Sequence, residues 1–204
     1  MFHVKHEGLT SYAAALGVAF SEEQAGLMEE FERLLEDRAV GLGMIAATDA
    51  PRLWDRHVLD SLRAATAVTA EDRSAADLGS GAGLPGIVVA IACPQLAVTL
   101  IEVRRARVAF LELATERLGL SNATVLPERV EEASGLFDLC FARAYGDPGR
   151  SWRDAQRLVG PTGRLVYFAG SSFDPRDVPS DARTAILPAP PVASAGPLVI
   201  MSRQ

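Results

Sequence analysis

The fold is decided by the stretch Asp77-Leu78-Gly79-Ser80-Gly81-Ala82-Gly83-Leu84-Pro85-Gly86. An apolar run precedes it and a helix-compatible apolar run follows it, so the glycines lie at a strand-to-helix turn. A turn this rich in glycine lets the backbone approach a ligand closely. In an open α/β sheet, ligands bind outside the carboxyl ends of the strands. The stretch therefore predicts a βαβ unit with a ligand at this turn.

The rest of the chain from residue 75 repeats this alternation of short apolar runs and helical segments, which is typical of a mostly parallel sheet. Strands are expected at 75–79, 98–103, 123–127, 137–142 and 163–169, and helices at about 85–93, 104–118 and 148–159. After Gly170, frequent prolines exclude long helices and leave room for short edge strands, with 197–202 as the last one. We expect a doubly wound, Rossmann-like α/β fold.

The first 70 residues contain no convincing strand and are expected to form a helical extension before a compact domain at 71–204. Ser21-Glu22-Glu23-Gln24 is a capping box that opens one amphipathic helix. A second helix begins near Asp49 and Pro51. His57 and Asp60 share a face of it. An acid–base pair is one interpretation, and contacts between this helix and the sheet are the favoured one.

Composition limits the classes of function. The chain has 204 residues, a net charge of −6 and a pI near 5.1, which argues against a surface that binds nucleic acid nonspecifically but is compatible with a local basic patch. It has no run of ~20 apolar residues and no secretory signal, so we expect a cytoplasmic protein with no membrane partner. Cys93 and Cys140 are expected to be buried without a disulfide, Trp152 to be core, and the three histidines not to form a structural metal site.

The glycine turn allows two interpretations of its ligand. Residues 81–86 match G-x-G-x-x-G, and Glu102 follows about 20 residues later, as in a dinucleotide fold. Asp77, two residues before the first glycine, instead suits a ligand with an ammonium and a sulfonium, which favours S-adenosylmethionine. Glu102 would accept hydrogen bonds from ribose hydroxyls in either case. A purely structural turn with a solvated Glu102 is the remaining alternative.

The positions after the strands are rich in arginine. Because the carboxyl ends of parallel strands meet at one edge, these side chains predict a rim for an anionic substrate; they are Arg104, Arg105, Arg107, Arg129 and Arg143. The alternative is that the first three solvate an exposed helix and that Arg129 pairs with Glu128 or Glu132.

Five motifs, in order, resemble the bacterial ribosomal RNA small subunit methyltransferase G family, also called glucose-inhibited division protein B. They are the glycine stretch quoted above and Leu53-Trp54-Asp55-Arg56-His57-Val58-Leu59-Asp60-Ser61, Arg107-Val108-Ala109-Phe110-Leu111, Arg129-Val130-Glu131-Glu132 and Arg143-Ala144. The resemblance implies a class I methyltransferase that uses S-adenosylmethionine to methylate guanine N7 in 16S ribosomal RNA, with the small ribosomal subunit as partner.

The resemblance also implies site residues. Cofactor contacts are expected at Gly79, Leu84, Val130, Glu131, Arg143 and the ribose-binding Glu102, together with Asp77, Gly81 and Gly83 from the glycine turn. Arg129 and Arg143 are expected to shape the catalytic pocket, and Arg104, Arg105 and Arg107 to bind substrate.

The chain departs from the family at three places: Ala106 and Ala169 stand where the family has lysines, and Gly43-Met44-Ile45 replaces Asn-Leu-Thr. Each lost phosphate contact weakens RNA binding. A methyltransferase of a small molecule or protein is therefore an alternative. A cofactor-binding paralogue without turnover and an NAD-dependent oxidoreductase are further alternatives. We expect a monomer.

Overall fold

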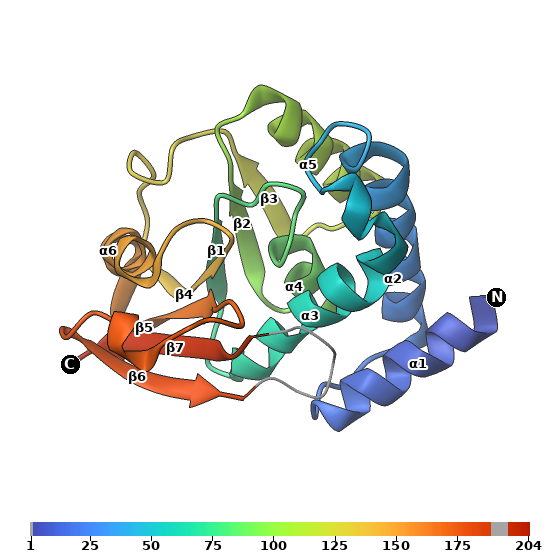
Figure 1. Ribbon diagram of the computed structural model, residues 1–204. Coiled ribbons are helices and arrows are strands. Elements are labelled where there is room, and N and C mark those ends of the chain that lie inside the picture. Colours follow the sequence, from blue (N-terminus) through green and yellow to red (C-terminus); the bar gives the residue numbers. More distant parts are fainter. Residues whose placement is uncertain (1, 189–195) are drawn as a thin grey trace.

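A computed structural model describes residues 2–188 and 196–204, with side chains from Gly8 onward. Its centre is a seven-stranded sheet of order β3-β2-β1-β4-β5-β7-β6 (Figure 1). The strands are β1 (Ser74–Leu78), β2 (Ala97–Ile101), β3 (Ala123–Leu126), β4 (Phe137–Arg143), β5 (Val159–Phe168), β6 (Ala182–Leu187) and β7 (Leu198–Arg203). The first five are parallel, and β7 runs antiparallel to both β5 and β6. The strand order reverses between β1 and β4, and ligands bind at such a switch point.

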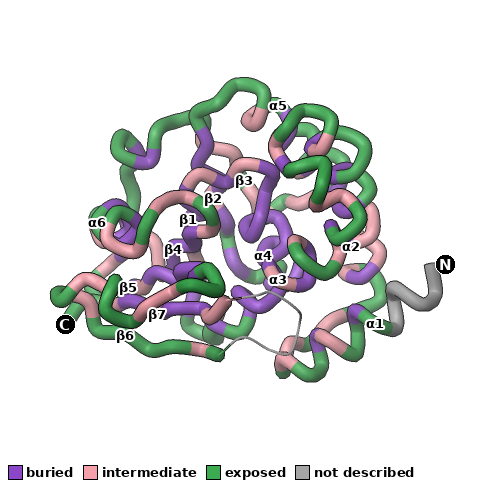
Figure 2. Tube along the Cα trace, in the orientation of Figure 1, coloured by how far each residue is buried: buried purple, intermediate pink, exposed green. Residues whose placement is uncertain are grey.

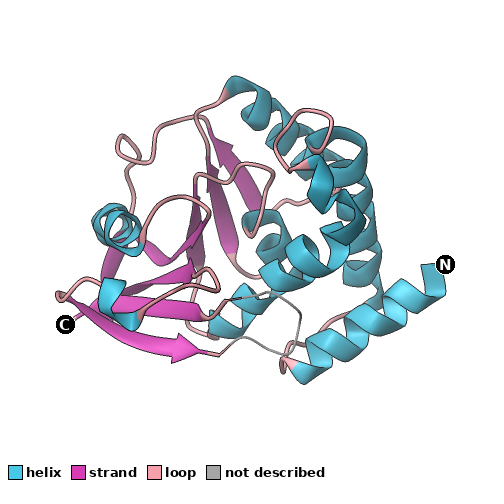
Figure 3. Ribbon diagram, in the orientation of Figure 1, coloured by secondary structure: helices cyan, strands magenta, loops and turns pink. Residues whose placement is uncertain are grey.

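Helices cover both faces of the sheet (Figure 3). The longer ones are α1 (Phe2–Ala15), α2 (Glu22–Leu34), α4 (Gly86–Ala92), α5 (Arg105–Arg117) and α6 (Pro148–Leu158). Shorter helical segments are η1 (Leu35–Ala39), η2 (Ala47–Arg52), η3 (Leu53–Leu59), α3 (Asp60–Leu62), η4 (Arg63–Ala67) and η5 (Pro175–Asp177). We call residues 2–67 the lead-in segment. It packs with α4 and α5 on one side, and α6 packs on β4 and β5 from the other.

Strand alternation explains this layering. Successive side chains of a strand point to opposite faces. Leu139 and Phe141 of β4 therefore join the core under the lead-in segment, whereas Cys140 and Ala142 join the core under α6. All seven residues of α4 are buried, because the lead-in segment covers the side of α4 that the sheet leaves open (Figure 2). The mostly parallel, doubly wound sheet is confirmed.

The predicted elements after residue 75 are confirmed, with ends that differ by one or two residues, apart from the start of β5. This strand begins at Val159, not 163, because Val159 pairs with Phe137 before a register shift. Gly160, Pro161 and Gly163 resemble a turn in sequence, yet they form an irregular strand edge. A Cβ at Gly163 would lie 2.8 Å from the Phe137 carbonyl oxygen, so glycine lets the strands approach there.

The helical extension is confirmed in type but not in detail. The Ser21 capping box is present, with Ser21 Oγ accepting from Gln24 N–H and the Gln24 side chain accepting from Ser21 N–H. The expected helix from Asp49 is instead a series of short segments of three helical types that begins at Ala47. Asp49 lies inside the first of these segments, whose N-cap is Ala46, and its carboxylate pairs with Arg52 and Arg56. Helix α1 was not predicted.

The burial predictions hold. Cys93 and Cys140 are buried, and burial raises the pKa of the Cys93 thiol to about 11. Trp152 is 1% exposed in the core under α6. Among the described residues, no helix combines the length and apolar character needed to cross a membrane.

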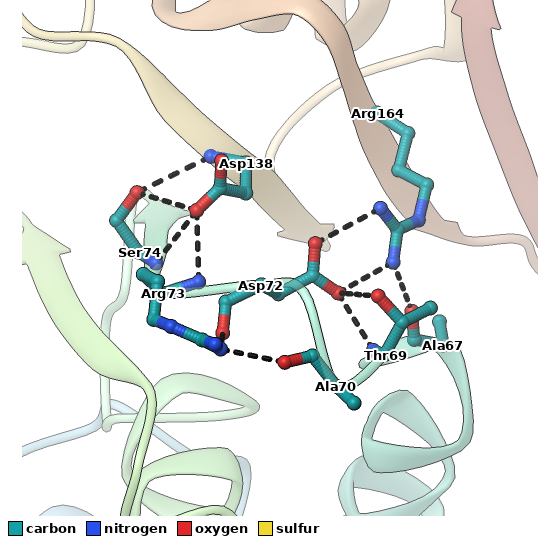
Figure 4. Close-up of polar contacts among 8 residues, drawn as sticks. All are labelled: Ala67, Thr69, Ala70, Asp72, Arg73, Ser74, Asp138 and Arg164. Carbon is teal, nitrogen blue, oxygen red and sulfur yellow. Dashed lines mark hydrogen bonds and ion pairs between the residues drawn. The ribbon is translucent and has the colours of Figure 1, made fainter.

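A network of polar side chains lies at the amino ends of the central strands (Figure 4). Arg164 of β5 donates to both carboxylate oxygens of Asp72, at 3.1 and 2.7 Å, and to the carbonyl of Ala67. Thr69 donates to the same carboxylate from its backbone and its hydroxyl. Burial acts to raise the pKa of Asp72, but these hydrogen bonds outweigh it and the pKa is lowered. The network therefore ties η4 to β5 at the edge opposite the glycine turn.

Candidate active site

Two adjoining cavities open at the carboxyl ends of β1, β2 and β4. The first cavity, of about 280 Å³, contains Glu102 and Val130 in its wall, and the second, of about 380 Å³, contains His57 and Arg143. Gly79, Arg107 and Ala144 line both, so the two cavities form one cleft. The cleft lies at the switch point of the sheet and includes the glycine turn, where the sequence predicts the ligand.

The glycine turn forms the floor of this cleft. Gly79, Gly81 and Gly83 have φ values of +65°, +58° and +81°, a region that side chains with a Cβ rarely adopt. A Cβ on Gly79 would also lie 2.8 Å from the ring of Tyr145, and one on Gly83 would lie 2.5 Å from Ile87. The turn therefore needs glycine both for its backbone and for its contacts. Gly79 and Gly81 line the cleft, whereas Gly83 lines neither cavity.

Asp77 lies beneath the turn and not in the cavity wall. Its side chain is 1% exposed, and its Oδ2 accepts a hydrogen bond from the Gly86 N–H at 3.0 Å. Burial raises the pKa of Asp77 to about 7, and the Gly86 hydrogen bond opposes this rise. The direct contact with a ligand cation that the sequence suggested is therefore not supported by the placement of Asp77. Its carboxyl joins the end of β1 to the start of α4.

Glu102 stands at the end of β2 and is 5% exposed. Its Oε1 accepts from the backbone N–H groups of Val103 and Arg104, and its Oε2 accepts from Gly81 N–H at 3.2 Å. Arg107 Nη1 lies 3.5 Å from the same Oε2. A carboxylate offers about four acceptor positions, and in this structure the three backbone bonds and the long bond from Arg107 share them. The carboxylate is thus fixed in position before a ligand arrives.

The predicted arginine rim separates into four groups. Arg104 and Arg129 line the first cavity, Arg107 lines both cavities and Arg143 lines the second. Arg105 is exposed at the start of α5 and lines neither cavity. Four of the five arginines are thus brought together.

Arg143 is held by the lead-in segment. Its Nη2 donates to the Arg56 carbonyl at 2.9 Å and lies 3.3 Å from His57 Nδ1 and 3.2 Å from Asp60 Oδ2. Asp60 is itself fixed by Arg63, whose Nη1 lies 2.7 Å from its Oδ1. The favoured interpretation of His57 and Asp60, contacts between the lead-in helix and the sheet, is confirmed.

His57 connects this cluster to a second carboxylate. Its Nε2 is buried and lies 3.5 Å from Asp49 Oδ2, outside hydrogen-bond geometry. Burial and the nearby Arg143 charge lower the pKa of His57, and Asp49 acts in the opposite direction. His57 is therefore neutral at pH 7 in this structure.

The remaining predicted contacts fall on both sides of the cleft. Val130 and the exposed Glu131 line the first cavity, and Leu84 lines the second.

The backbone of Ala144, which lines both cavities, has a φ of +52°, a strained value for a residue with a Cβ.

Sequence reasoning missed Tyr145 and Arg150. The Tyr145 ring packs on Gly79, its hydroxyl donates to Asp154 at 2.8 Å, and the Arg150 guanidinium lies 5.0 Å from the ring centroid. Arg150 also pairs with Glu131 at 3.0 Å. Tyr145 lies two residues after the end of β4, and the rule that identified the other rim residues, a position just after a strand, applies to it as well.

Comparison with solved structures supports the fold. A SAM-dependent methyltransferase from Aquifex aeolicus superposes with a TM-score of 0.57 and 16% identity, over 76% of this chain and 94% of that one. The fold is that of class I S-adenosylmethionine-dependent methyltransferases.

Comparison with protein sequences goes further. The family described as rRNA small subunit methyltransferase G matches residues 24–178. The family member of a Nocardioides species is 42% identical over 75% of this chain, which spans 62% of that protein's length. The Corynebacterium diphtheriae member is 37% identical, over 84% of this chain and 77% of the relative. The chain therefore belongs to the ribosomal RNA small subunit methyltransferase G family.

Proposed function

We propose that this protein transfers a methyl group from S-adenosylmethionine to guanine N7 in 16S ribosomal RNA of the small ribosomal subunit. The observation that carries the proposal is the single cleft with two different halves that meet at Gly79. The first cavity suits a nucleoside, and the second places a guanidinium beside the meeting point. A donor and an acceptor can thus lie end to end, which is the arrangement that methyl transfer needs.

The residues of the first cavity fit the donor. Glu102 is fixed by backbone N–H groups, and a ribose hydroxyl can take the acceptor position that Arg107 contacts at 3.5 Å, while Val130 supplies an apolar wall. Gly79 and Gly81 have no side chains, so their backbone comes close to whatever lies in the cleft. When bound, S-adenosylmethionine supplies an electrophilic methyl group on a sulfonium.

We propose that Asp77 acts by positioning this turn. Its bond to Gly86 fixes the start of α4 relative to β1, and so sets the backbone path of residues 79–83.

The second cavity requires no general base for this reaction. Guanine N7 carries no proton, so its lone pair forms the new C–N bond as the C–S bond breaks, and the positive charge moves from sulfur to the purine. The task of the chain is to hold the base in line with the methyl group and to exclude water. Arg143 and Arg107 line this cavity and can donate to the guanine O6.

The outer rim suits the RNA backbone. Arg104 and Arg129 line the first cavity and are exposed, and the exposed Arg105 lies next to Arg104. Such cations bind phosphates and strengthen association in low salt. Because one chain supplies both cavities, we expect the monomer to be active.

The test is methylation of small subunits and of free 16S RNA isolated from cells that lack this gene, with radiolabelled donor and cleavage at N7-methylguanine to map the product. We expect incorporation at one guanine. Arg143→Ala should lower the rate at least about tenfold, while Arg153→Ala, an exposed change on α6, should not. Incorporation only into small molecules or protein would overturn the assignment of ribosomal RNA, and no turnover with any acceptor would indicate a cofactor-binding paralogue.

A further inference from the structure

Arg143 presents two different sides to its surroundings. One nitrogen, Nη2, makes the polar contacts with the lead-in segment, to Arg56, His57 and Asp60. Among the described residues, neither Nε nor Nη1 has a hydrogen-bond acceptor, and neither is a fully buried atom. Since Arg143 lines the second cavity, these two N–H groups are free to bind the acceptor.

The contact with His57 depends on the protonation of the imidazole. A guanidinium nitrogen only donates hydrogen bonds, so Nδ1 of His57 must accept and the ring proton must sit on Nε2. Nε2 is the atom that faces Asp49 Oδ2 at 3.5 Å. Protonation of His57 would place an N–H on Nδ1, 3.3 Å from the Arg143 nitrogen, and the two cations would repel each other.

We propose that neutral His57 is a positioning residue that holds Arg143 toward the methyl acceptor, and that its protonation releases Arg143 and switches methyl transfer off in acid. The inference rests on the proposed function, because it takes the second cavity as the acceptor half of the site. It assigns His57 an effect through Arg143 and no proton transfer in the reaction itself.

The charged groups around His57 set the direction of this switch. Asp49 faces it from η2, Arg56 is its neighbour on η3, and Arg143 faces it from β4. Burial and the two cations disfavour imidazolium and together outweigh Asp49, which favours it, so the pKa of His57 is lowered from 6.5. Asp60 does not face the imidazole directly but pairs with Arg63 at 2.7 Å and with Arg143 at 3.2 Å. The switch therefore operates below pH 6.5.

Two variants separate positioning from structure. In His57→Asn the amide oxygen occupies the place of Nδ1 and accepts from Arg143 at every pH, whereas His57→Gln places its amide near Nε2 and loses that acceptor. The readout is kcat/KM for small subunits between pH 5 and 8, with S-adenosylhomocysteine affinity measured by calorimetry at each pH. A second readout is the ¹⁵N chemical shifts of the His57 ring in the ligand-free protein, which report the tautomer directly.

For the wild type we expect kcat/KM to fall about tenfold per pH unit below the pKa of His57. His57→Asn should keep activity within about threefold at pH 7.5 and lose this acid limb, and His57→Gln should be at least about tenfold slower at pH 7.5. S-adenosylhomocysteine affinity should stay within about twofold in both variants.

An acid limb retained in His57→Asn, a normal rate in His57→Gln, or an Nδ1–H tautomer would each overturn the proposal. Failure of the proposed function has a different signature. In that case the wild type would not methylate small subunits at any pH, whatever the ring tautomer.

Discussion

Replacing Asp77 with asparagine tests how the glycine turn is anchored. Asparagine has nearly the same shape, and its side-chain oxygen can accept the Gly86 hydrogen bond that Asp77 Oδ2 accepts at 3.0 Å. What it removes is the ionisation of a carboxyl that is 1% exposed. Burial raises the pKa of this carboxyl from 3.8 to about 7, so the folded protein binds a proton that the unfolded chain releases near pH 4.

The sign and size of the effect follow from proton linkage. Between pH 4 and pH 7 the folded state holds more protons than the unfolded state, so stability falls as pH rises. Each pKa unit corresponds to about 1.4 kcal/mol, and a rise of about 3 therefore corresponds to about 4 kcal/mol over the whole range. This contribution is fully present below pH 3.8 and lost as pH rises through about 7. Between pH 5 and pH 8 we expect Asp77 to account for a loss of about 3 kcal/mol.

The assay is urea unfolding of the ligand-free protein at pH 5, 6, 7 and 8, followed by fluorescence of Trp54 and Trp152. The quantity to compare is the difference in unfolding free energy between Asp77→Asn and wild type. It should shift by about 3 kcal/mol in favour of the variant from pH 5 to pH 8. Asp181→Asn, an exposed change, is the matched control and should show a constant difference. A difference for Asp77→Asn that does not change with pH would refute the reasoning.

Three further changes test other parts of the structure. Glu102→Gln should weaken S-adenosylhomocysteine binding about 10- to 100-fold by calorimetry, since the new side-chain NH₂ would face a backbone N–H. The exposed Glu132→Gln is the control and should leave the affinity unchanged. Equal affinities for the two variants would show that Glu102 does not bind the donor. Gly86→Ala should lower the unfolding free energy by about 1–3 kcal/mol, because a Cβ there would lie 2.3 Å from Leu100 Cδ2. Gly26→Ala, where no atom lies within 4 Å of the added Cβ, should raise the unfolding free energy by about 0.5–1 kcal/mol. Asp72→Asn should lose about 1–3 kcal/mol at pH 7. Because the folded pKa of Asp72 is lowered, that difference should shrink as pH falls below about 4, and a difference constant with pH would contradict the Arg164 pairing.

The sheet was predictable because its strands are continuous apolar runs bounded by turn residues, and strands buried on both faces need that pattern. Helix α2 was predictable from the Ser21 capping box, a local signal. The segment from Ala47 to Ala67 was not, since its three helical types depend on tertiary contacts such as that of Asp60 with Arg143. The sequence left room for an edge strand but did not locate β6, because the residues of β6 are mostly exposed and the strand forms by pairing with β7.

The sequence predicted most of the residues that line the cleft, but not how their side chains are arranged. Position after a strand identified Glu102 and Arg143, because the carboxyl ends of parallel strands meet at one edge. The same rule gave Asp77 a ligand contact that its burial does not support, since position along a strand does not tell which way a side chain points at the turn. Nor could it show that Arg143 is bound to His57, 86 residues away, because that contact exists only in the folded chain.

The lead-in segment is more than an extension added to a finished domain. Leu9, Met28, Phe31 and Leu62 belong to the same core as strand residues such as Phe141, so the segment and the sheet share one hydrophobic interior. The segment also supplies Asp49, Arg56 and His57 to the second cavity and the partners that hold Arg143. A division at residue 70 would therefore expose buried α4 and remove a wall of the second cavity, while leaving every residue that lines the first cavity in the chain. The proposed donor half of the site is lined entirely by residues of 71–204, and the proposed acceptor half is completed by the lead-in segment where it docks on the sheet.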